Sequence, residues 1–297
     1  MRAIFVARHA EREDYAWKAR DDNWQAQAER PWDTPLTKAG HAQAAALGRA
    51  VAGHCERLCL APVTEIRSSP LLRCGQTSSG AARVLGVKRL LVEPGLAETM
   101  SEDWYRSWAI PGADSTWGGP THSKAGTPVA KGSLHAAALR PAAEIYDGTD
   151  ALLRRMRAHG DSWVEEVSDS VDSASAIELL TYTWESPETE EEQTLRMRLV
   201  CERLRASNFG GTEGSVLMLT HGGPTGALYC ALTTQEKAPN CGYCGLYAYR
   251  PLAADIDASG VGWEALVVAD HDHLEEVPEA TRGGPNDLEE QTPANDT

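Results

Sequence analysis

The sequence predicts a three-layer α/β/α sandwich with a mostly parallel sheet and a long insertion after the third strand. Short apolar runs alternate with longer helical patterns, as is typical of parallel strands that are joined by helices. The first run, residues 2–7, is almost continuously apolar, as expected of a strand buried on both faces. The chain has 297 residues, of which 42% are hydrophobic, and we expect one domain over residues 1–273.

The first part of the chain carries three predicted strands and two helices. After the strand over 2–7, the polar segment 8–36 is predicted to be a loop. The alanine-rich segment 36–58 favours a helix with Thr37 as its N-cap. The next elements are expected to be a strand over 63–69, a helix over 70–86 with Pro70 in its first turn, and a strand over 88–93.

The second part resumes this pattern after an insertion on the core, predicted over residues 99–187, which contains a helical segment near 148–168. Residues 274–297 are acidic and rich in proline and glycine, and they are predicted to form a disordered tail. Between them we expect a helix over 187–207, the strand GSVLMLT, a helix that begins with HGGPTG, and a closing hairpin of GLYAYR and WEALVVAD.

Charge and cysteine content restrict the partners. The net charge of −15 and a pI near 5.0 argue against nucleic acid or an anionic membrane as the main partner. Local arginines can still bind a small anionic substrate. A homodimer is also compatible with this composition. Seven cysteines without dense spacing indicate reduced thiols in a cytoplasmic protein. No apolar run is long enough to cross a bilayer, and no signal peptide is predicted.

Polar residues follow three of the predicted strands at the point where each strand ends. Arg8 and His9 follow the first strand, Ser68–Ser69 end the second, and His221 follows the fourth. The carboxyl ends of parallel strands meet at one edge of the sheet, which is where open α/β folds bind ligands. Arg73 lies at the start of the next helix. The sequence therefore predicts two histidines and two arginines at one edge.

Arginines at this edge suit a phosphate monoester, because a guanidinium group binds phosphate in a bidentate manner and keeps its proton. Arg8 and Arg73 are the main candidates. Arg12 either adds a third contact or forms an ion pair with a neighbouring carboxylate. Gly222 begins a predicted helix, where backbone N–H groups and the helix dipole favour an anion.

The two histidines suit covalent phosphoryl transfer. A neutral imidazole can attack phosphorus, so His9 can become phosphorylated while His221 donates a hydrogen bond to the transferred group. The leaving group then needs a proton from a carboxylic acid. Glu98 follows the turn after the third strand and is our first candidate; Glu93 and Glu11 stay open as alternatives.

Five ordered motifs, RHAER, DTPLTKAGHAQA, SSPLLRCGQTS, VEPGLAE and LTHGGPT, resemble those of the histidine phosphatase superfamily, also called phosphoglycerate-mutase-like. The resemblance runs from residue 6 to about residue 228. It implies a phosphoglycerate-mutase-like fold and a phosphomonoesterase that needs no cofactor. RHAERED and VEPGLAE are most similar to the branch of eukaryotic protein phosphatases that suppress T-cell receptor signalling. The implied substrate is a small phosphate ester or a phosphoprotein.

The resemblance also implies a role for each site residue. His9 is the phosphorylated nucleophile, Glu98 is the proton donor, and Arg12 contacts the substrate or its phosphate. The remaining phosphate-binding residues are Arg8, Arg73 and His221.

The chain departs from the family at Ala10, where a glycine usually follows the Arg-His pair. If this position requires a positive φ, alanine costs about 1 kcal/mol, and its methyl group narrows the site. Because of Ala10, a non-catalytic phosphate-binding module for signalling is an alternative function of the chain. A phosphoglycerate-mutase-type phosphotransferase is the other alternative, although the residues after Glu98, TMSEDWYRSW, do not resemble the mutase continuation.

Two further patterns have alternative interpretations. If the closing hairpin is antiparallel, the CGYC motif approaches the HDH motif, and a zinc site of Cys241, Cys244, His271 and His273 becomes a hypothesis. Its alternative is a turn of small buried thiols beside the acidic tail. The tryptophan-rich segments DYAWKARDDNWQ and EDWYRSWAIPG either line the mouth of the site or pack the insertion onto the core.

Overall fold

A computed structural model describes residues 1–19, 33–98, 148–169, 189–208, 213–233, 235–252 and 262–277. These residues contain a sheet with the strand order β4-β3-β2-β5-β1-β6-β7. The pairs from β4 to β1 are parallel, whereas β6 is antiparallel to both β1 and β7. The strands are β1 (Ile4–Arg8), β2 (Val63–Ser68), β3 (Arg89–Val92), β4 (Glu166–Asp169), β5 (Ser215–Thr220), β6 (Leu246–Pro251) and β7 (Trp263–Asp270).

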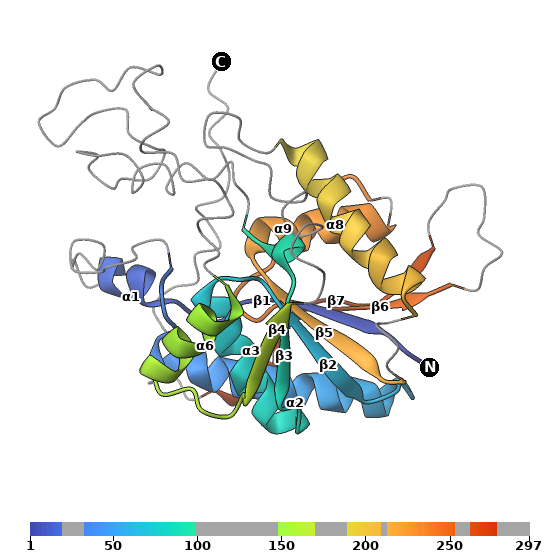
Figure 1. The fold of residues 1–297 in the computed structure, drawn as a ribbon. Helices are drawn as coiled ribbons and strands as arrows, with labels where there is room; N and C mark the ends of the chain where they lie inside the picture. The colour runs from blue at the N-terminus through green and yellow to red at the C-terminus, as the bar shows by residue number, and fades with distance from the viewer. Residues whose placement is uncertain are drawn as a thin grey trace, which may run out of the picture.

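Helices cover both faces of the sheet, as Figure 1 shows. On one face lie α2 (Lys38–Arg57), α3 (Leu72–Leu85) and α6 (Thr149–Ala158); on the other lie α8 (Glu190–Ala206) and α9 (Gly222–Thr233). The shorter elements are α1 (Glu13–Ala19), η1 (Pro94–Leu96) and η4 (Asp272–Glu276). The predicted α/β/α sandwich with a mostly parallel sheet is confirmed. None of the described helices is both long and apolar enough to span a membrane.

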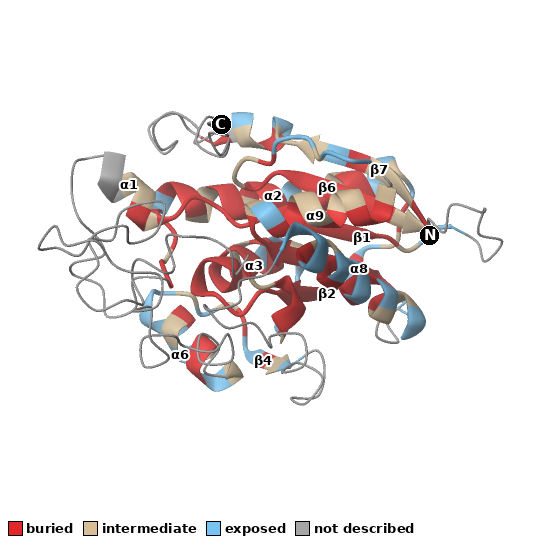
Figure 2. Cartoon of the chain, turned by 90° about the horizontal axis from the view of Figure 1, so that it is seen from above, coloured by how far each residue is buried: buried red, intermediate tan, exposed pale blue. Residues whose placement is uncertain are grey.

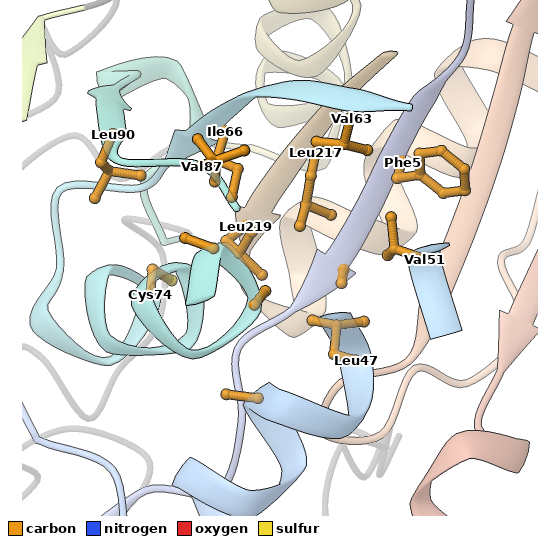
Figure 3. Packing of buried hydrophobic residues seen from close by; sticks show 14 of the residues in the cluster. Phe5, Leu47, Val51, Val63, Ile66, Cys74, Val87, Leu90, Leu217 and Leu219 are labelled. Carbon is orange, nitrogen blue, oxygen red and sulfur yellow. The ribbon is translucent and has the colours of Figure 1, made fainter. Parts of the chain in front are cut away.

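Two apolar clusters, one on each face, hold the layers together. Strand residues alternate between the faces, so Phe5 packs with the α2 residues Leu47 and Val51, as Figure 3 shows. Its neighbour Ile4 packs on the opposite face with Val200 of α8. Every residue of β1 and β5 is buried, which agrees with their central place in a sheet covered on both sides. Figure 2 shows this buried centre, with exposed residues on the outer side of α8.

The structure differs from the predicted elements at two places. The predicted helix near 148–168 ends at Ala158, and Glu166–Asp169 form β4, which pairs in parallel with β3. The segment over 8–36, predicted to be a loop, contains α1. The chain is too polar in both segments for apolar periodicity to reveal these elements.

The start of α3 and the end of the described chain also differ from their predicted bounds. Pro70 precedes α3 instead of lying in its first turn, because the helix begins at Leu72. Its N-terminus is capped from a distant loop, where Asp33 Oδ1 accepts from Leu72 N at 2.7 Å. At the C-terminal end, η4 and the buried Val277 extend the ordered chain past residue 274, and residues 278–297 lie outside the described part.

Helices α2 and α3 pack closely, and glycine permits this at Gly80. A Cβ atom at Gly80 would lie 2.6 Å from Ala44 Cβ, whereas one at Gly53 would meet only Arg57 Nη1, at 3.5 Å. We expect Gly80→Ala to lower the free energy of unfolding by about 1–2 kcal/mol because overpacking outweighs helix propensity. Gly53→Ala, the matched control, should raise it by about 0.5–1 kcal/mol. Urea denaturation measures both, and equal stabilisation by the two alanines would contradict this packing.

Candidate active site

The predicted edge is assembled by three neighbouring strands, β2, β5 and β1. Backbone hydrogen bonds fix the residues just past their ends: His9 N donates to Thr220 O at 2.8 Å, and Ser69 N donates to Leu219 O at 2.9 Å. A ring nitrogen of His9, a carboxylate oxygen of Glu98 and a ring nitrogen of His221 all lie within 4.8 Å of one another. Side chains from distant parts of the sequence thus converge as predicted.

His9 is buried, and its orientation suits a nucleophile. Its Nδ1 lies 2.8 Å from Ala10 O, an acceptor, so Nδ1 carries the proton in the neutral ring. The lone pair then resides on Nε2, the nitrogen that can attack. The ring is 5.3 Å from that of His221 between centroids, and the two planes meet at 64°.

Glu98 joins His221 to Arg73. Its Oε2 lies 3.2 Å from His221 Nδ1 and 3.3 Å from Arg73 Nη2. On the other side of the ring, His221 Nε2 lies 2.7 Å from Ser69 Oγ. With Glu98 ionised beside the guanidinium group, His221 Nδ1 donates to the carboxylate and Nε2 accepts from the serine hydroxyl. Ser69, which the sequence analysis placed only at the end of a predicted strand, therefore orients this imidazole.

The three arginines differ in how they are held. Arg73 is fully buried in the first turn of α3, where it contacts Glu98. Arg8 Nη1 donates to Cys241 O at 3.0 Å. Arg12 forms a bidentate pair with Asp14, at 2.7 and 2.6 Å, so the ion pair that was left open as an alternative does form. The guanidinium group of Arg12 is therefore paired with Asp14, and its positive charge acts on the site by lowering the pKa of His9.

Burial and the arginines keep both imidazoles neutral. Burial is the main reason that the pKa of His9 lies well below 6.5, and the charges of Arg73, Arg8 and Arg12 lower it further. Burial also lowers the pKa of His221 to about 4, against the opposing effect of Glu98. Because the unfolded chain binds protons more readily in this range, both groups reduce stability as the pH falls from about 6.5 towards 4.

Histidine NMR tests these directions. At pH 6 we expect each of the two rings to carry a single proton, and the proton of His9 to reside on Nδ1. Long-range ¹H–¹⁵N spectra, assigned with His9→Asn and His221→Asn, report both the charge and the tautomer. A titration midpoint at or above 6.5 for either ring would contradict the cationic, buried environment described above.

The turn that carries Glu98 is held by residues that the sequence did not single out. The buried Arg196 of α8 donates through Nη1 to Gly95 O at 2.5 Å and to Ala97 O at 3.1 Å. Thr220 Oγ1 donates to Leu96 O at 2.7 Å. These bonds fix the backbone on both sides of residue 96, just before Glu98. The acid candidate is therefore positioned from both α8 and β5.

The carboxylates of the other two acid candidates, Glu93 and Glu11, contact groups other than His9 and His221. Glu93 Oε1 accepts from Gly95 N at 3.1 Å and lies 3.4 Å from Arg203 Nη2. Glu11 Oε1 accepts from Thr37 Oγ1 at 2.6 Å, at the start of α2. Among Glu98, Glu93 and Glu11, the geometry favours Glu98 as the acid.

Ala10 adopts no strained backbone conformation. It is not among the residues with positive φ, so the expected cost of replacing glycine does not arise. Its methyl group is buried in the apolar cluster that includes Phe5, and its N–H donates to Thr77 Oγ1 at 3.0 Å. The departure from the family pattern therefore carries no backbone penalty. Gly222 begins α9 directly after His221, as predicted, so its backbone N–H lies at a helix N-terminus beside the site.

The described residues do not gather the four predicted zinc ligands. β6 and β7 are antiparallel, with Leu246 opposite Asp270, as predicted. A Cβ atom at Gly245 would lie 2.8 Å from Cys241 Sγ and 2.6 Å from His271 Nε2, so these two side chains approach each other, but among the described residues no third ligand atom of the predicted set joins them. In this part of the chain, only His9, Glu98 and His221 gather three such ligand atoms. The nearby arginine charges make that group a site for an anion rather than a cation.

The second tryptophan-rich segment lies outside the described residues, and the first is described only as far as residue 19, within α1. Of these segments, the side chains of Asp14, Tyr15 and Ala16 are described. The ring of Tyr15 lies under the guanidinium group of Arg12, 4.7 Å from its Cζ.

Comparisons with solved structures report similar chains. A mycobacterial glucosyl-3-phosphoglycerate phosphatase is 18% identical, with a TM-score of 0.49 over 91% of this chain and 99% of that chain. A phosphoserine phosphatase mutant from Entamoeba histolytica is 17% identical, with a TM-score of 0.45 over 92% and 100%. A phosphoglycerate mutase from Bacillus anthracis is 14% identical, with a TM-score of 0.46 over 92% and 95%. No curated protein matches the chain.

The family model described as the histidine phosphatase superfamily, branch 1, matches residues 4–125. The matched range includes β1 with Arg8 and His9, the start of α3 with Arg73, and the turn with Glu98. The structure brings His221, from beyond this range, to the same site. The similarity to this family is therefore limited to residues 4–125, less than half of the chain.

Proposed function

We propose that the chain hydrolyses phosphate monoesters through a phosphohistidine intermediate on His9. The observation that carries this proposal is the convergence of His9, His221 and Glu98 within 4.8 Å, beside the charges of Arg8 and Arg73. A dianionic phosphoryl group complements these cations, and neutral imidazoles leave one nitrogen able to attack phosphorus.

In the first step, Arg8, Arg73 and the N–H of Gly222 bind the phosphoryl oxygens. His9 Nε2 donates its lone pair to phosphorus, and the bond between phosphorus and the ester oxygen breaks. Glu98, which takes up a proton from solvent once the phosphoryl dianion has displaced it from Arg73 and His221, gives that proton to the departing oxygen. His221 Nδ1 stabilises the negative charge on the transferred group by donating a hydrogen bond.

In the second step, water attacks the phosphohistidine. Glu98, now a carboxylate, accepts a proton from that water while the nitrogen–phosphorus bond breaks. Inorganic phosphate leaves and His9 regains its lone pair. No step in this scheme requires a metal ion, and the cationic surroundings of His9 disfavour one.

The substrate class is part of the proposal. We propose a small phosphate ester or a phosphoprotein, on the basis of the single anionic group that this site is built to bind. The likeness of RHAERED and VEPGLAE to protein phosphatases that suppress T-cell receptor signalling favours an aryl phosphate such as phosphotyrosine.

An assay with para-nitrophenyl phosphate in the presence of EDTA tests the proposal. We expect phosphate release between mildly acidic and neutral pH that chelation does not reduce. Conversion of 3-phosphoglycerate with a bisphosphate primer, without comparable ester hydrolysis, would instead indicate the mutase alternative. Tight phosphate binding with no turnover of any ester in a screen would indicate the binding module.

A further inference from the structure

The loop between α9 and β6 holds Arg8, the last residue of β1, and His9, which follows it. Arg8 N donates to Gly245 O, and Cys244 N donates to His9 O, each at 3.3 Å. Arg8 Nη1 also donates to Cys241 O at 3.0 Å. Gly245 N donates to Gly242 O at 3.0 Å, which closes a tight turn, and Cys244 completes it with a positive φ of 53°. The CGYC motif is thus a rigid support for the phosphate site.

Tyr243 lies in this turn and contacts both site residues. Arg8 Cζ lies 4.6 Å from the centroid of the tyrosine ring, in the geometry of a cation–π contact. The His9 ring lies 5.7 Å from the same ring between centroids, at 49°. Tyr243 is only partly buried, whereas Arg8 and His9 are buried. The ring therefore covers the outer side of the two residues.

Arg8 is held differently from its two neighbours. Arg73 contacts Glu98, and Arg12 contacts Asp14. The contacts described for Arg8 are a carbonyl oxygen and the tyrosine ring, not a carboxylate. An aromatic face restrains a guanidinium group without neutralising its charge or occupying its N–H groups.

We propose that Tyr243 is a positioning residue for the oxyanion: its ring holds the Arg8 guanidinium so that its remaining N–H groups face the phosphoryl group. This inference rests on the proposed function and deepens it. The turn fixes the ring, the ring fixes Arg8, and the charge of Arg8 stays available to the substrate. The binding of any phosphate ester, and of inorganic phosphate, then depends on an aromatic side chain at position 243.

Three variants test the proposal. Tyr243→Phe keeps the aromatic face, Tyr243→Leu removes it, and Tyr229→Leu is the control, because Tyr229 is also partly buried and its ring pairs with that of Tyr247. Isothermal titration with orthophosphate gives the dissociation constant, and steady-state assays give kcat and KM for para-nitrophenyl phosphate. Thermal melts confirm that each variant is folded.

We expect Tyr243→Leu to weaken orthophosphate binding and to raise KM, each by about tenfold. Tyr243→Phe and Tyr229→Leu should both stay within about twofold of the wild type. In an Arg8→Lys background, Tyr243→Leu should cost less than about threefold, since the planar group that it orients is gone.

The outcomes separate this inference from the function on which it rests. A wild type that neither binds orthophosphate nor hydrolyses esters would overturn both. A wild type that does both, with unchanged orthophosphate affinity in Tyr243→Leu, would overturn the role of Tyr243 alone. Equal losses in Tyr243→Phe and Tyr243→Leu, or an undiminished effect in the Arg8→Lys background, would also overturn it, because the ring would then not act through Arg8.

Discussion

Replacement of His9 by asparagine is expected to lower kcat for para-nitrophenyl phosphate by roughly 10⁴-fold or more, because the covalent route is lost. Asparagine keeps a hydrogen-bond donor that can reach Ala10 O, so the turn should keep its shape. Orthophosphate binding should change by less than about tenfold, since the arginines that neutralise the anion stay in place. Steady-state kinetics and orthophosphate titration measure the two effects.

His54→Asn is the matched control for a buried histidine. His54 lies on α2, and its Nε2 lies 2.6 Å from Asp270 Oδ2. We expect its kcat to stay within about threefold of the wild type, because no reacting group is touched. Turnover by His9→Asn at the level of this control would exclude His9 as the nucleophile.

Glu98→Gln is expected to strengthen orthophosphate binding and to lower kcat. In the free protein, Glu98 Oε2 lies 3.3 Å from Arg73 Nη2 and 3.2 Å from His221 Nδ1, two donors that a phosphoryl oxygen would also use. The carboxylate thus occupies the place of a substrate oxygen and must yield it on binding. A neutral amide competes less well, so orthophosphate should bind roughly threefold to tenfold more tightly to the variant.

The same substitution removes the proton donor. We expect kcat to fall by about 10²–10⁴-fold for alkyl phosphates, whose alkoxide leaving groups need a proton. The loss should be much smaller for aryl phosphates with acidic phenols. A series of esters with leaving groups of graded pKa measures this dependence. Glu93→Gln is the control from the same motif, and its leaving-group dependence should match the wild type. An unchanged dependence in Glu98→Gln would assign the acid to another residue.

The main features of the site followed from the sequence because strand topology is a strong constraint. Once 2–7, 63–69 and 214–220 are interpreted as parallel strands, the residues that follow them must meet at one edge. That reasoning placed Arg8, His9 and His221 together, as the structure does. The preference for Glu98 over Glu93 followed from the turn at Pro94 and Gly95, since a residue after this turn can reach the edge of the sheet.

The contacts that orient these groups could not be predicted, because they join residues distant in sequence. Nothing in a local pattern indicates that Arg196 holds the turn before Glu98, about a hundred residues earlier. Strand β4, with the sequence EVSD, has no apolar run and is recognisable only from its pairing with β3. Cys241 approaches His271, but among the described residues no third ligand of the predicted zinc site joins them, and sequence spacing alone could not show this.

Isolation of the phosphoenzyme tests the central claim most directly. The wild-type protein is mixed with a slowly hydrolysed phosphate ester, quenched in alkali, digested and analysed by mass spectrometry. We predict one phosphoryl group on His9, stable in alkali and lost in acid, and absent from His9→Asn. A phosphoryl group on another residue, or ester hydrolysis by protein that carries none at any time in the turnover, would contradict the account.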